Sequence, residues 1–177
     1  ENTLSINIAT GGQIAIIKRK KNSLFQTRPS INNNYSYDCI TQLPAGRLID
    51  LYLKSTNSDL LSLSNRKFNE SILKKSSICP DLFSKKEMIM YLQNLTEKYQ
   101  SQADDYLLSS LLKKYAYLIN LYKKEYNFNK IVMSGSIIEN YNFIKDGLKH
   151  IFHDIEIKYN KNDVLKTHFF LLKNNDK

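Results

Sequence analysis

The sequence contains few of the residues on which disulfide-rich, metal-binding and membrane-spanning proteins depend. Its two cysteines, Cys39 and Cys79, lie far apart, with no CxxC pair and no neighbouring pair of histidines. This spacing argues against a disulfide framework or a zinc site, and it favours two small buried side chains in a reducing, cytoplasmic environment. The longest apolar runs, such as Ile14–Ile17 and Phe169–Leu172, are too short to span a bilayer.

Acidic residues are also scarce relative to basic ones. The chain has 26 Lys and Arg residues against 17 Asp and Glu residues, which gives a formal charge of +9. An excess of this kind can indicate nucleic-acid binding. Here the lysines are dispersed, and only Lys18–Lys21 forms a block, which we interpret as a solvated strand end or hairpin turn. We therefore do not expect nucleic acid to be the main partner.

The first part of the chain shows the pattern of a small sheet. Leu4–Ala9 alternates apolar with small or polar residues, Thr10–Gly12 supplies a turn, and Gln13–Ile17 resumes the alternation, as in a β-hairpin. The polar segment 19–34 is predicted to be a loop, and Tyr35–Leu43 a third strand.

After Pro44 the period changes to that of helices. Apolar spacing from Ala45 onward predicts one helix, Asn65–Lys75 a weaker one, and Ser84–Lys98 one that begins with a Ser84–Glu87 capping box. Further segments complete the prediction in this order: the long helix Ser101–Tyr126, the strand Lys130–Ser134, the helix Asn142–Phe152, the strand Ile155–Lys158, and the amphipathic segment Asp163–Leu172. The alternation of strands and helices predicts an α/β domain that contains parallel pairs.

Three glycine-containing turns follow predicted strands. They contain Thr10-Gly11, Gly46 after Pro44-Ala45, and Gly135-Ser136. Phosphate binding requires backbone without a Cβ atom, free N–H groups and a nearby hydroxyl group. A single turn of this type is weak evidence, but three of them suggest one nucleotide that is contacted from three sides.

These turns resemble three motifs of the FGGY carbohydrate kinases. Leu4–Gln13 is similar to the second phosphate loop, Leu43–Asp50 to the segment that begins a helix beside the nucleotide, and Ile131–Asn140 to the adenosine motif. The three occur in the family's order, and the Asn-Ile-x-Thr-x-x-Gln string and the Ser-Gly-Ser turn look most like the sedoheptulokinase-like branch.

The resemblance implies the ribonuclease-H-like, actin-like ATPase fold, a mixed sheet with helices on both faces. Residues 1–177 would then form the C-terminal nucleotide-binding domain of a sugar kinase, with ATP and Mg²⁺ as cofactors and a small sugar as substrate. Thr10 and Gly11 would contact the β- and γ-phosphates, and Gly46 would lie along the nucleotide. Gly135 and Ser136 would lie at the adenosine, and Asn140 would hydrogen-bond the base or ribose, unless it is simply a helix N-cap.

The chain also departs from the family pattern. Ala9 and Ser136 stand where the family has Gly, and with five glycines in all the backbone has fewer places for close approach to a ligand. The segment Val164–Phe170 is bulkier than the family's Gly-Ala-rich helix.

No catalytic residue can be assigned in this chain. The family's catalytic Asp precedes the phosphate loop, and no residue before Thr10 is Asp. The Asp104-Asp105 pair and Asp81 lack the matching context and are predicted to be surface charges. No metal-ligating set is present either.

Two functions therefore remain open. One is the ATP-binding half of a carbohydrate kinase, inactive alone because the catalytic Asp and most of the sugar contacts belong to an N-terminal half. The other is a degenerate, non-catalytic domain that acts as a protein-interaction module. Because the sequence begins with Glu1 rather than Met, we expect the native protein to be longer.

Overall fold

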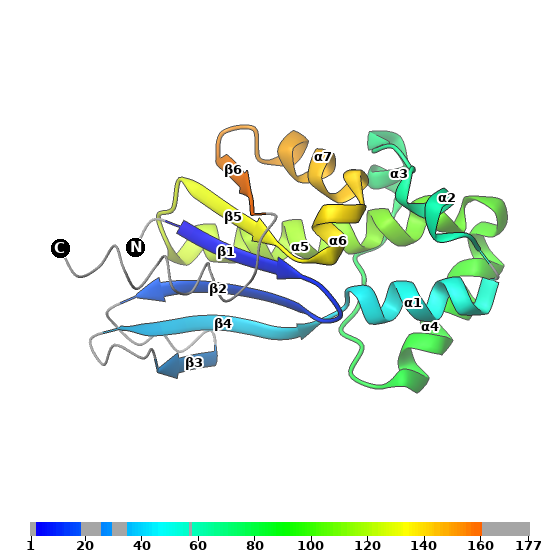
Figure 1. Cartoon of the computed structure of the whole chain (residues 1–177), viewed down its shortest axis with the longest axis horizontal. Coiled ribbons are helices and arrows are strands. Elements are labelled where there is room, and N and C mark those ends of the chain that lie inside the picture. The colour runs from blue at the N-terminus through cyan, green and yellow to red at the C-terminus, as the bar shows by residue number, and fades with distance from the viewer. Residues whose placement is uncertain (1–2, 19–25, 30–34, 57, 161–177) are drawn as a thin grey trace.

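The computed structural model describes residues 3–18, 26–29, 35–56 and 58–160. Within these residues, six strands form one mixed sheet in the order β3-β4-β2-β1-β5-β6 (Figure 1). Their bounds are β1 Thr3–Ile8, β2 Gly12–Lys18, β3 Gln26–Pro29, β4 Ser36–Leu43, β5 Lys130–Ser134 and β6 Glu156–Tyr159. The predicted hairpin, third strand and later strands are confirmed within one or two residues.

The strand pairing defines which ends of the strands lie together. β1 is antiparallel to β2 and β2 is antiparallel to β4, so β4 runs in the same direction as β1. β5 pairs with β1 in parallel, and β6 pairs with β5 in parallel. The carboxyl ends of β1, β4, β5 and β6 therefore lie at one edge of the sheet.

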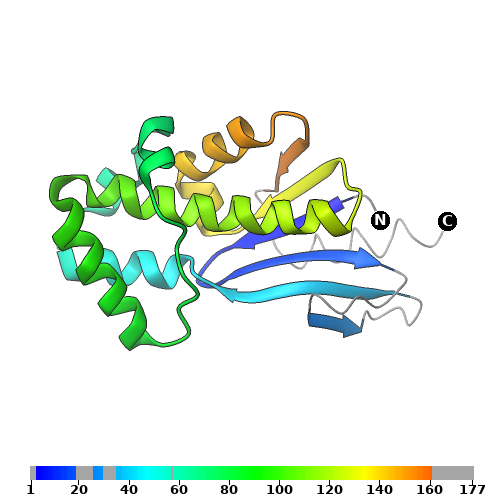
Figure 2. The same ribbon diagram turned by 180° about the vertical axis from the view of Figure 1, so that it is seen from behind.

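Helices follow β4 and β5. Their bounds are α1 Gly46–Thr56, α2 Leu60–Ser64, α3 Glu70–Lys75, α4 Lys85–Tyr99, α5 Ala103–Glu125, α6 Ser136–Asn140 and α7 Asn142–Ile151. The long helix α5 lies along one face of the sheet, behind it in Figure 1 and in front of it in Figure 2. The amphipathic segment predicted at Asp163–Leu172 lies outside the described residues. No described helix is long and apolar enough to cross a membrane.

The core lies between this face of the sheet and α5. In β1 and β2, alternate residues point inward, among them Leu4, Ile6 and Ile14, all fully buried. The apolar stripe of α5 supplies the opposite wall and includes Tyr115 and Tyr122. Apolar residues thus recur every second position in the strands and about every 3.6 positions in the helix, and the two apolar surfaces pack against each other. Cys39 and Cys79 are both buried and free, as predicted.

Several sequence predictions need correction. Segment 19–34 is not wholly a loop, because Gln26–Pro29 forms the edge strand β3, which pairs with β4. Four residues are too few for a periodicity signal, and the partner strand supplies the hydrogen bonds. The helix predicted from Asn65 begins only at Glu70, because the side chain of Asn69 accepts hydrogen bonds from the Ser71 and Ile72 amides and caps it. The capping box of α4 is present as predicted.

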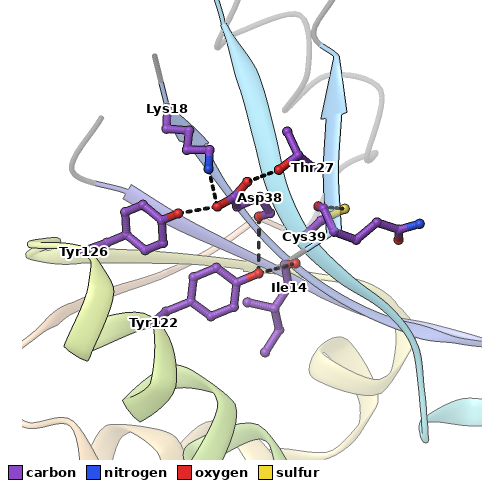
Figure 3. Close-up of polar contacts among 8 residues, drawn as sticks. Ile14, Lys18, Thr27, Asp38, Cys39, Tyr122 and Tyr126 are labelled. Carbon is purple, nitrogen blue, oxygen red and sulfur yellow. Dashed lines mark hydrogen bonds and ion pairs between the residues drawn. The ribbon is translucent and has the colours of Figure 1, made fainter. Parts of the chain in front are cut away.

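Lys18 is not a solvated strand end. It continues the inward face of β2, and its ammonium group forms an ion pair with the fully buried carboxylate of Asp38 on β4 (Figure 3). Thr27 donates a hydrogen bond to the same carboxylate at 2.8 Å, and Tyr126 at the end of α5 also donates to it. A buried lysine is tolerated only where such partners compensate for lost hydration. The rest of the basic block, Arg19–Lys21, lies outside the described residues.

Candidate functional site

The candidate site lies at the edge of the sheet where β1, β4 and β5 end. Ala9–Gly11 connect β1 to β2, Pro44-Ala45 connect β4 to α1, and Gly135 connects β5 to α6. Because these strands are parallel, their carboxyl ends meet at the edge where α/β folds bind ligands. All three predicted turns are at this edge.

Gly46 holds α1 against the hairpin turn. Its N–H donates to the carbonyl of Ala9 at 2.8 Å, and the N–H of Arg47 donates to the carbonyl of Thr10 at 2.9 Å. A Cβ atom at Gly46 would lie 2.6 Å from the Ala9 carbonyl oxygen, which no side chain could tolerate. Gly46 is thus required where the helix meets the turn, and its amide is already bonded within the protein.

Gly135 packs against the end of β1. Its φ is +105°, in the region that favours glycine. A Cβ atom there would lie 2.4 Å from the Ile8 carbonyl oxygen and 2.5 Å from the side-chain oxygen of Asn7. The turns with Gly46 and Gly135 therefore both contact Asn7–Thr10, although they are distant from each other in the sequence.

The hairpin turn between them is open to solvent. Thr10 and Gly11 are exposed, and a Cβ atom added at Gly11 would meet nothing within 4 Å. The N–H of Ala9 donates to the Gly11 carbonyl at 3.2 Å, which closes the turn. The exposed Thr10 hydroxyl group and the free space at Gly11 are compatible with a phosphate that approaches from outside.

Ser136 and Asn140 lie at the two ends of α6, and both are exposed. The alternative interpretation of Asn140 as a helix N-cap is wrong, because Asn140 is the last residue of α6. The next helix has Tyr141 at its N-cap position and no side-chain capping bond. The side chain of Asn140 is therefore not used to begin a helix.

A cavity of about 430 Å³ opens beside the hairpin turn on the β4 side, and we call it the hairpin cavity. Its lining consists of Thr10–Gln13, Thr41–Ala45 and Leu82-Phe83, together with Asn7, Arg47 and Met88. This volume is in the range of small-molecule sites. Gly135, Ser136 and Asn140 are not among its lining residues, so the site has two sides separated by the end of β1.

Asn7 marks the boundary between the two sides. Its side-chain oxygen is buried and has no hydrogen-bond partner among the described residues. A buried polar atom without a partner is unusual in a folded protein, and a bound water or ligand commonly explains it. Asn7, Gln42 and Phe83 were missed by sequence reasoning. Only Asn7 stands within a predicted motif, and the other two carry no signal that distinguishes them from surface residues.

The charges around the cavity favour anions. Arg47 is the basic residue of the lining, and no carboxylate is among the described residues that form it. No group of His, Cys, Asp and Glu residues in the described ranges could hold a metal ion. Tyr115 supports the cavity floor from α5, where its hydroxyl group donates to the Pro44 carbonyl at 3.1 Å, and burial raises its pKa.

The acidic pair expected at the surface has a structural role instead. Asp104 accepts hydrogen bonds from the Tyr52 hydroxyl group at 2.6 Å and from Arg66 at 2.8 Å. Asp105 forms a longer ion pair with Arg66, and burial raises its pKa. The sequence could not show this, because Tyr52 and Arg66 reach the start of α5 only in the folded chain. Asp81 is half exposed and pairs with Lys114 at 2.8 Å.

No protein-family model matches this chain, and no curated protein matches its sequence. Solved structures do match it. A ligand-bound xylulose kinase from Lactobacillus acidophilus is 12% identical with a TM-score of 0.64, and the match covers 97% of this chain and 37% of that one. A xylulose kinase from Rhodospirillum rubrum is 6% identical with a TM-score of 0.58, and the match covers 90% of this chain and 35% of that one.

The chain has the actin-like ATPase fold. A third match, the activator of the 2-hydroxyisocaproyl-CoA dehydratase from Clostridium difficile with bound ADPNP, is 15% identical with a TM-score of 0.54 and covers 99% of this chain and 63% of that one. The fold class predicted from the sequence, a ribonuclease-H-like mixed sheet with helices, is confirmed. The chain spans only about a third of the length of the two xylulose kinases.

Proposed function

We propose that this chain is the ATP-binding half of a carbohydrate kinase of the FGGY family, sedoheptulokinase-like and cytoplasmic. The observation that carries the proposal is the convergence of three glycine-containing turns around the end of β1, on an actin-like ATPase fold. Structural neighbours with this fold are sugar kinases and an activator that binds ADPNP, which supports the choice of ligand.

The proposed roles follow from position. Thr10 and Gly11 would meet the β- and γ-phosphates at the open hairpin turn, and Gly135, Ser136 and Asn140 would meet the adenosine. Gly46 would act indirectly, because its amide already bonds the turn. Mg²⁺, when bound, would neutralise phosphate charge. With no metal-ligand cluster in the described ranges, the ion would be held by the phosphates and the upstream half.

Phosphoryl transfer would need that upstream half. The sugar oxygen would bond to the γ-phosphorus, the bond to the β,γ-bridging oxygen would break, and the hydroxyl proton would pass to a carboxylate. No carboxylate is among the described residues that line the hairpin cavity, so this base would come from the upstream half of the proposed kinase.

A second candidate is a non-catalytic domain that binds a protein partner. Ala9 and Ser136 replace glycines of the family, and the apolar side chains of Phe83 and Met90 are exposed by 72% and 53%. The two functions make opposite predictions for nucleotide binding.

The test is a titration with ATP and with adenosine, followed by amide shifts in NMR spectra. We expect weak binding, about 4 to 6 kcal/mol, because one domain forms one wall of the cleft. Thr10→Val should weaken ATP binding and leave adenosine binding unchanged, because the lost hydroxyl group meets phosphates. Asn140→Ala should weaken both by about 1 kcal/mol, the value of a neutral hydrogen bond.

Two results would contradict the proposal. One is shifts scattered along α5 instead of residues 9–12 and 135–140. The other is an equal loss of ATP and adenosine binding in Thr10→Val. A complete absence of nucleotide binding would favour the interaction module.

A further inference from the structure

The hairpin cavity is shaped by an irregularity in the sheet. The register of β2 against β4 shifts between Gly12 and Ile14. Two residues of β4, Thr41 and Gln42, lie opposite the single residue Gln13 of β2, which is a β-bulge. Such a bulge re-aims side chains, and bulges are common next to binding sites. All three residues line the cavity.

Gln42 adopts this conformation at an energetic cost. Its φ is +61°, a left-handed value that glycine adopts more easily than glutamine. Strained residues of this kind concentrate at functional sites, where the side chain is needed in one direction. The side chain of Gln42 is also exposed, so it is not kept at this strained position for packing in the core.

The polar side chains of the cavity are not used within the protein. Those of Gln13, Thr41, Gln42 and Arg47 make no hydrogen bond or ion pair in the described part of the chain. Arg47 itself is held at the first turn of α1 by a backbone bond to Thr10. Amide, hydroxyl and guanidinium groups are therefore free to bind a ligand.

Another part of the cavity lining is apolar. Leu82, Phe83 and Met88 form it, and Phe83 is 72% exposed. The capping box of α4 positions this wall, since the Phe83 and Ser84 amides donate to the Glu87 carboxylate at 2.9 and 2.8 Å. These bonds also occupy the Glu87 carboxylate, and they lower its pKa. An aromatic side chain and amide groups in one cavity lining suit a small ring that carries hydroxyl groups.

We infer that the hairpin cavity binds a second small molecule beside the nucleotide, a sugar-sized compound that carries a phosphate group, with Arg47 paired to the phosphate and Gln42 and Phe83 contacting the ring. Guanidinium groups bind phosphate with two parallel hydrogen bonds. The inference rests on the proposed function for the neighbouring ligand. It goes further in assigning a second, phosphorylated ligand and residues outside the three motifs that bind it.

The location favours a second molecule over the nucleotide itself. The residues expected at adenosine lie on the β5 side of β1, whereas the cavity lies on the β4 side. The two sides meet at Asn7 and at the hairpin turn, where the phosphates would lie. A molecule in the cavity would therefore lie at the phosphate end of the nucleotide.

The test uses ribose 5-phosphate and ribose as probes of the whole chain, with amide shifts as readout. Ribose 5-phosphate should bind saturably and shift residues 10–13, 41–47 and 82–88, whereas ribose at equal concentration should bind at least tenfold more weakly. Arg47→Met should weaken ribose 5-phosphate binding at least tenfold, as expected for a lost charge-assisted bond. Lys54→Met, at the other end of α1, is the matched control and should change it less than twofold.

Gln42→Gly supplies a second variant that is expected to fold, because glycine adopts this left-handed φ without strain. It relieves the left-handed φ, so the thermal midpoint should rise while ribose 5-phosphate affinity falls several-fold. A variant that binds as tightly as the wild type would overturn the role of Gln42 and with it the assignment of the ring contacts.

Addition of ADP distinguishes the two possible sources of the phosphate. Ribose 5-phosphate should still bind in the presence of saturating ADP, with its affinity changed less than threefold. Competition between the two would overturn the inference, because the cavity would then hold the nucleotide's own phosphates. Equal losses of ribose 5-phosphate binding in Arg47→Met and Lys54→Met would also overturn the inference, because binding would then reflect a general attraction of the anion to a basic chain. If ADP binds nowhere while ribose 5-phosphate binds as described, the proposed function fails and the phosphate site stands.

Discussion

The glycines of this chain differ in whether a residue with a side chain could take their place. Gly135 combines a φ of +105° with backbone atoms of Ile8 in the space that a side chain would need. Gly11 has open space around it and no positive φ. The two residues stand in similar turns at the same edge of the sheet, so the sequence alone does not distinguish them.

We expect Gly135→Ala to lower the free energy of unfolding by about 3 kcal/mol, because the left-handed backbone and the close contact both add strain. Gly11→Ala is the matched control and should change it by no more than about 0.5 kcal/mol. Urea unfolding monitored by circular dichroism gives both values. Equal effects would show that the β5–α6 turn does not press on β1 as the structure has it.

The element that orients the sheet against its helical layer is β4. Asp38 accepts hydrogen bonds from neighbours on both sides, and the Tyr122 hydroxyl group of α5 donates to the Asp38 and Ile14 carbonyls at 3.2 and 3.3 Å (Figure 3). This buried network connects β2, β3 and β4 to the end of α5, at the end of the sheet opposite the candidate site.

Asp38→Asn should lower the free energy of unfolding by about 3 to 5 kcal/mol, because the ammonium group of Lys18 stays buried without its counter-ion. The double variant Lys18→Met/Asp38→Asn should recover much of this loss, since the uncompensated charge is then removed. A double-mutant cycle measured by chemical denaturation checks the coupling. Additive effects of the two changes would contradict a buried ion pair.

At the scale of the whole molecule, the connection that leads from α3 to α4 contributes to the response to alkaline pH through Cys79, alongside buried tyrosines whose pKa values are also raised. Burial raises the pKa of the Cys79 thiol in this connection to about 12, above its value of 9.0 when unperturbed. The folded state favours the neutral thiol, so this contribution to stability is complete below the pKa of the thiol in the unfolded chain. It is lost as the pH rises from that pKa toward the pKa of the thiol in the folded state. We expect the free energy of unfolding to fall between about pH 9 and 12.

Cys79→Ala isolates this contribution. It should be less stable at neutral pH, because a buried side chain is truncated, but its loss of stability above about pH 9 should be shallower by roughly 1.4 kcal/mol per pH unit. Denaturant titrations at several pH values provide the measurement. Identical slopes in both proteins would show that the thiol is not buried in the folded state.

Catalysis is also a property of the whole molecule. This chain should show no sugar-dependent hydrolysis or transfer from ATP, because its described cavity lining has no carboxylate to accept the hydroxyl proton. A coupled ADP assay with a panel of ketoses checks this, with the chain purified away from contaminating kinases. Phosphorylation of a sugar by this chain alone would contradict the proposal that it is one half of a kinase.

Local patterns in the sequence determined the secondary structure of most of the chain. Alternation in Leu4–Ala9, the capping box at Ser84 and the apolar period of Ser101–Tyr126 depend on neighbouring residues, so they can be read without the fold. Short or edge elements such as β3 and α2 lack enough residues for a period. The order of the three glycine-containing turns also indicated the fold class, because it resembles the order of the motifs in the FGGY kinases.

Only the tertiary structure decided which residues meet. The contact of Gly135 with β1 and the burial of Lys18 against Asp38 join residues that are distant in sequence. The burial of the unpaired oxygen of Asn7 likewise depends on packing that the sequence does not show. The hairpin cavity likewise combines a bulge in β4, the first turn of α1 and the start of α4. Pairing across a sheet depends on register and long-range packing, which short sequence patterns do not encode.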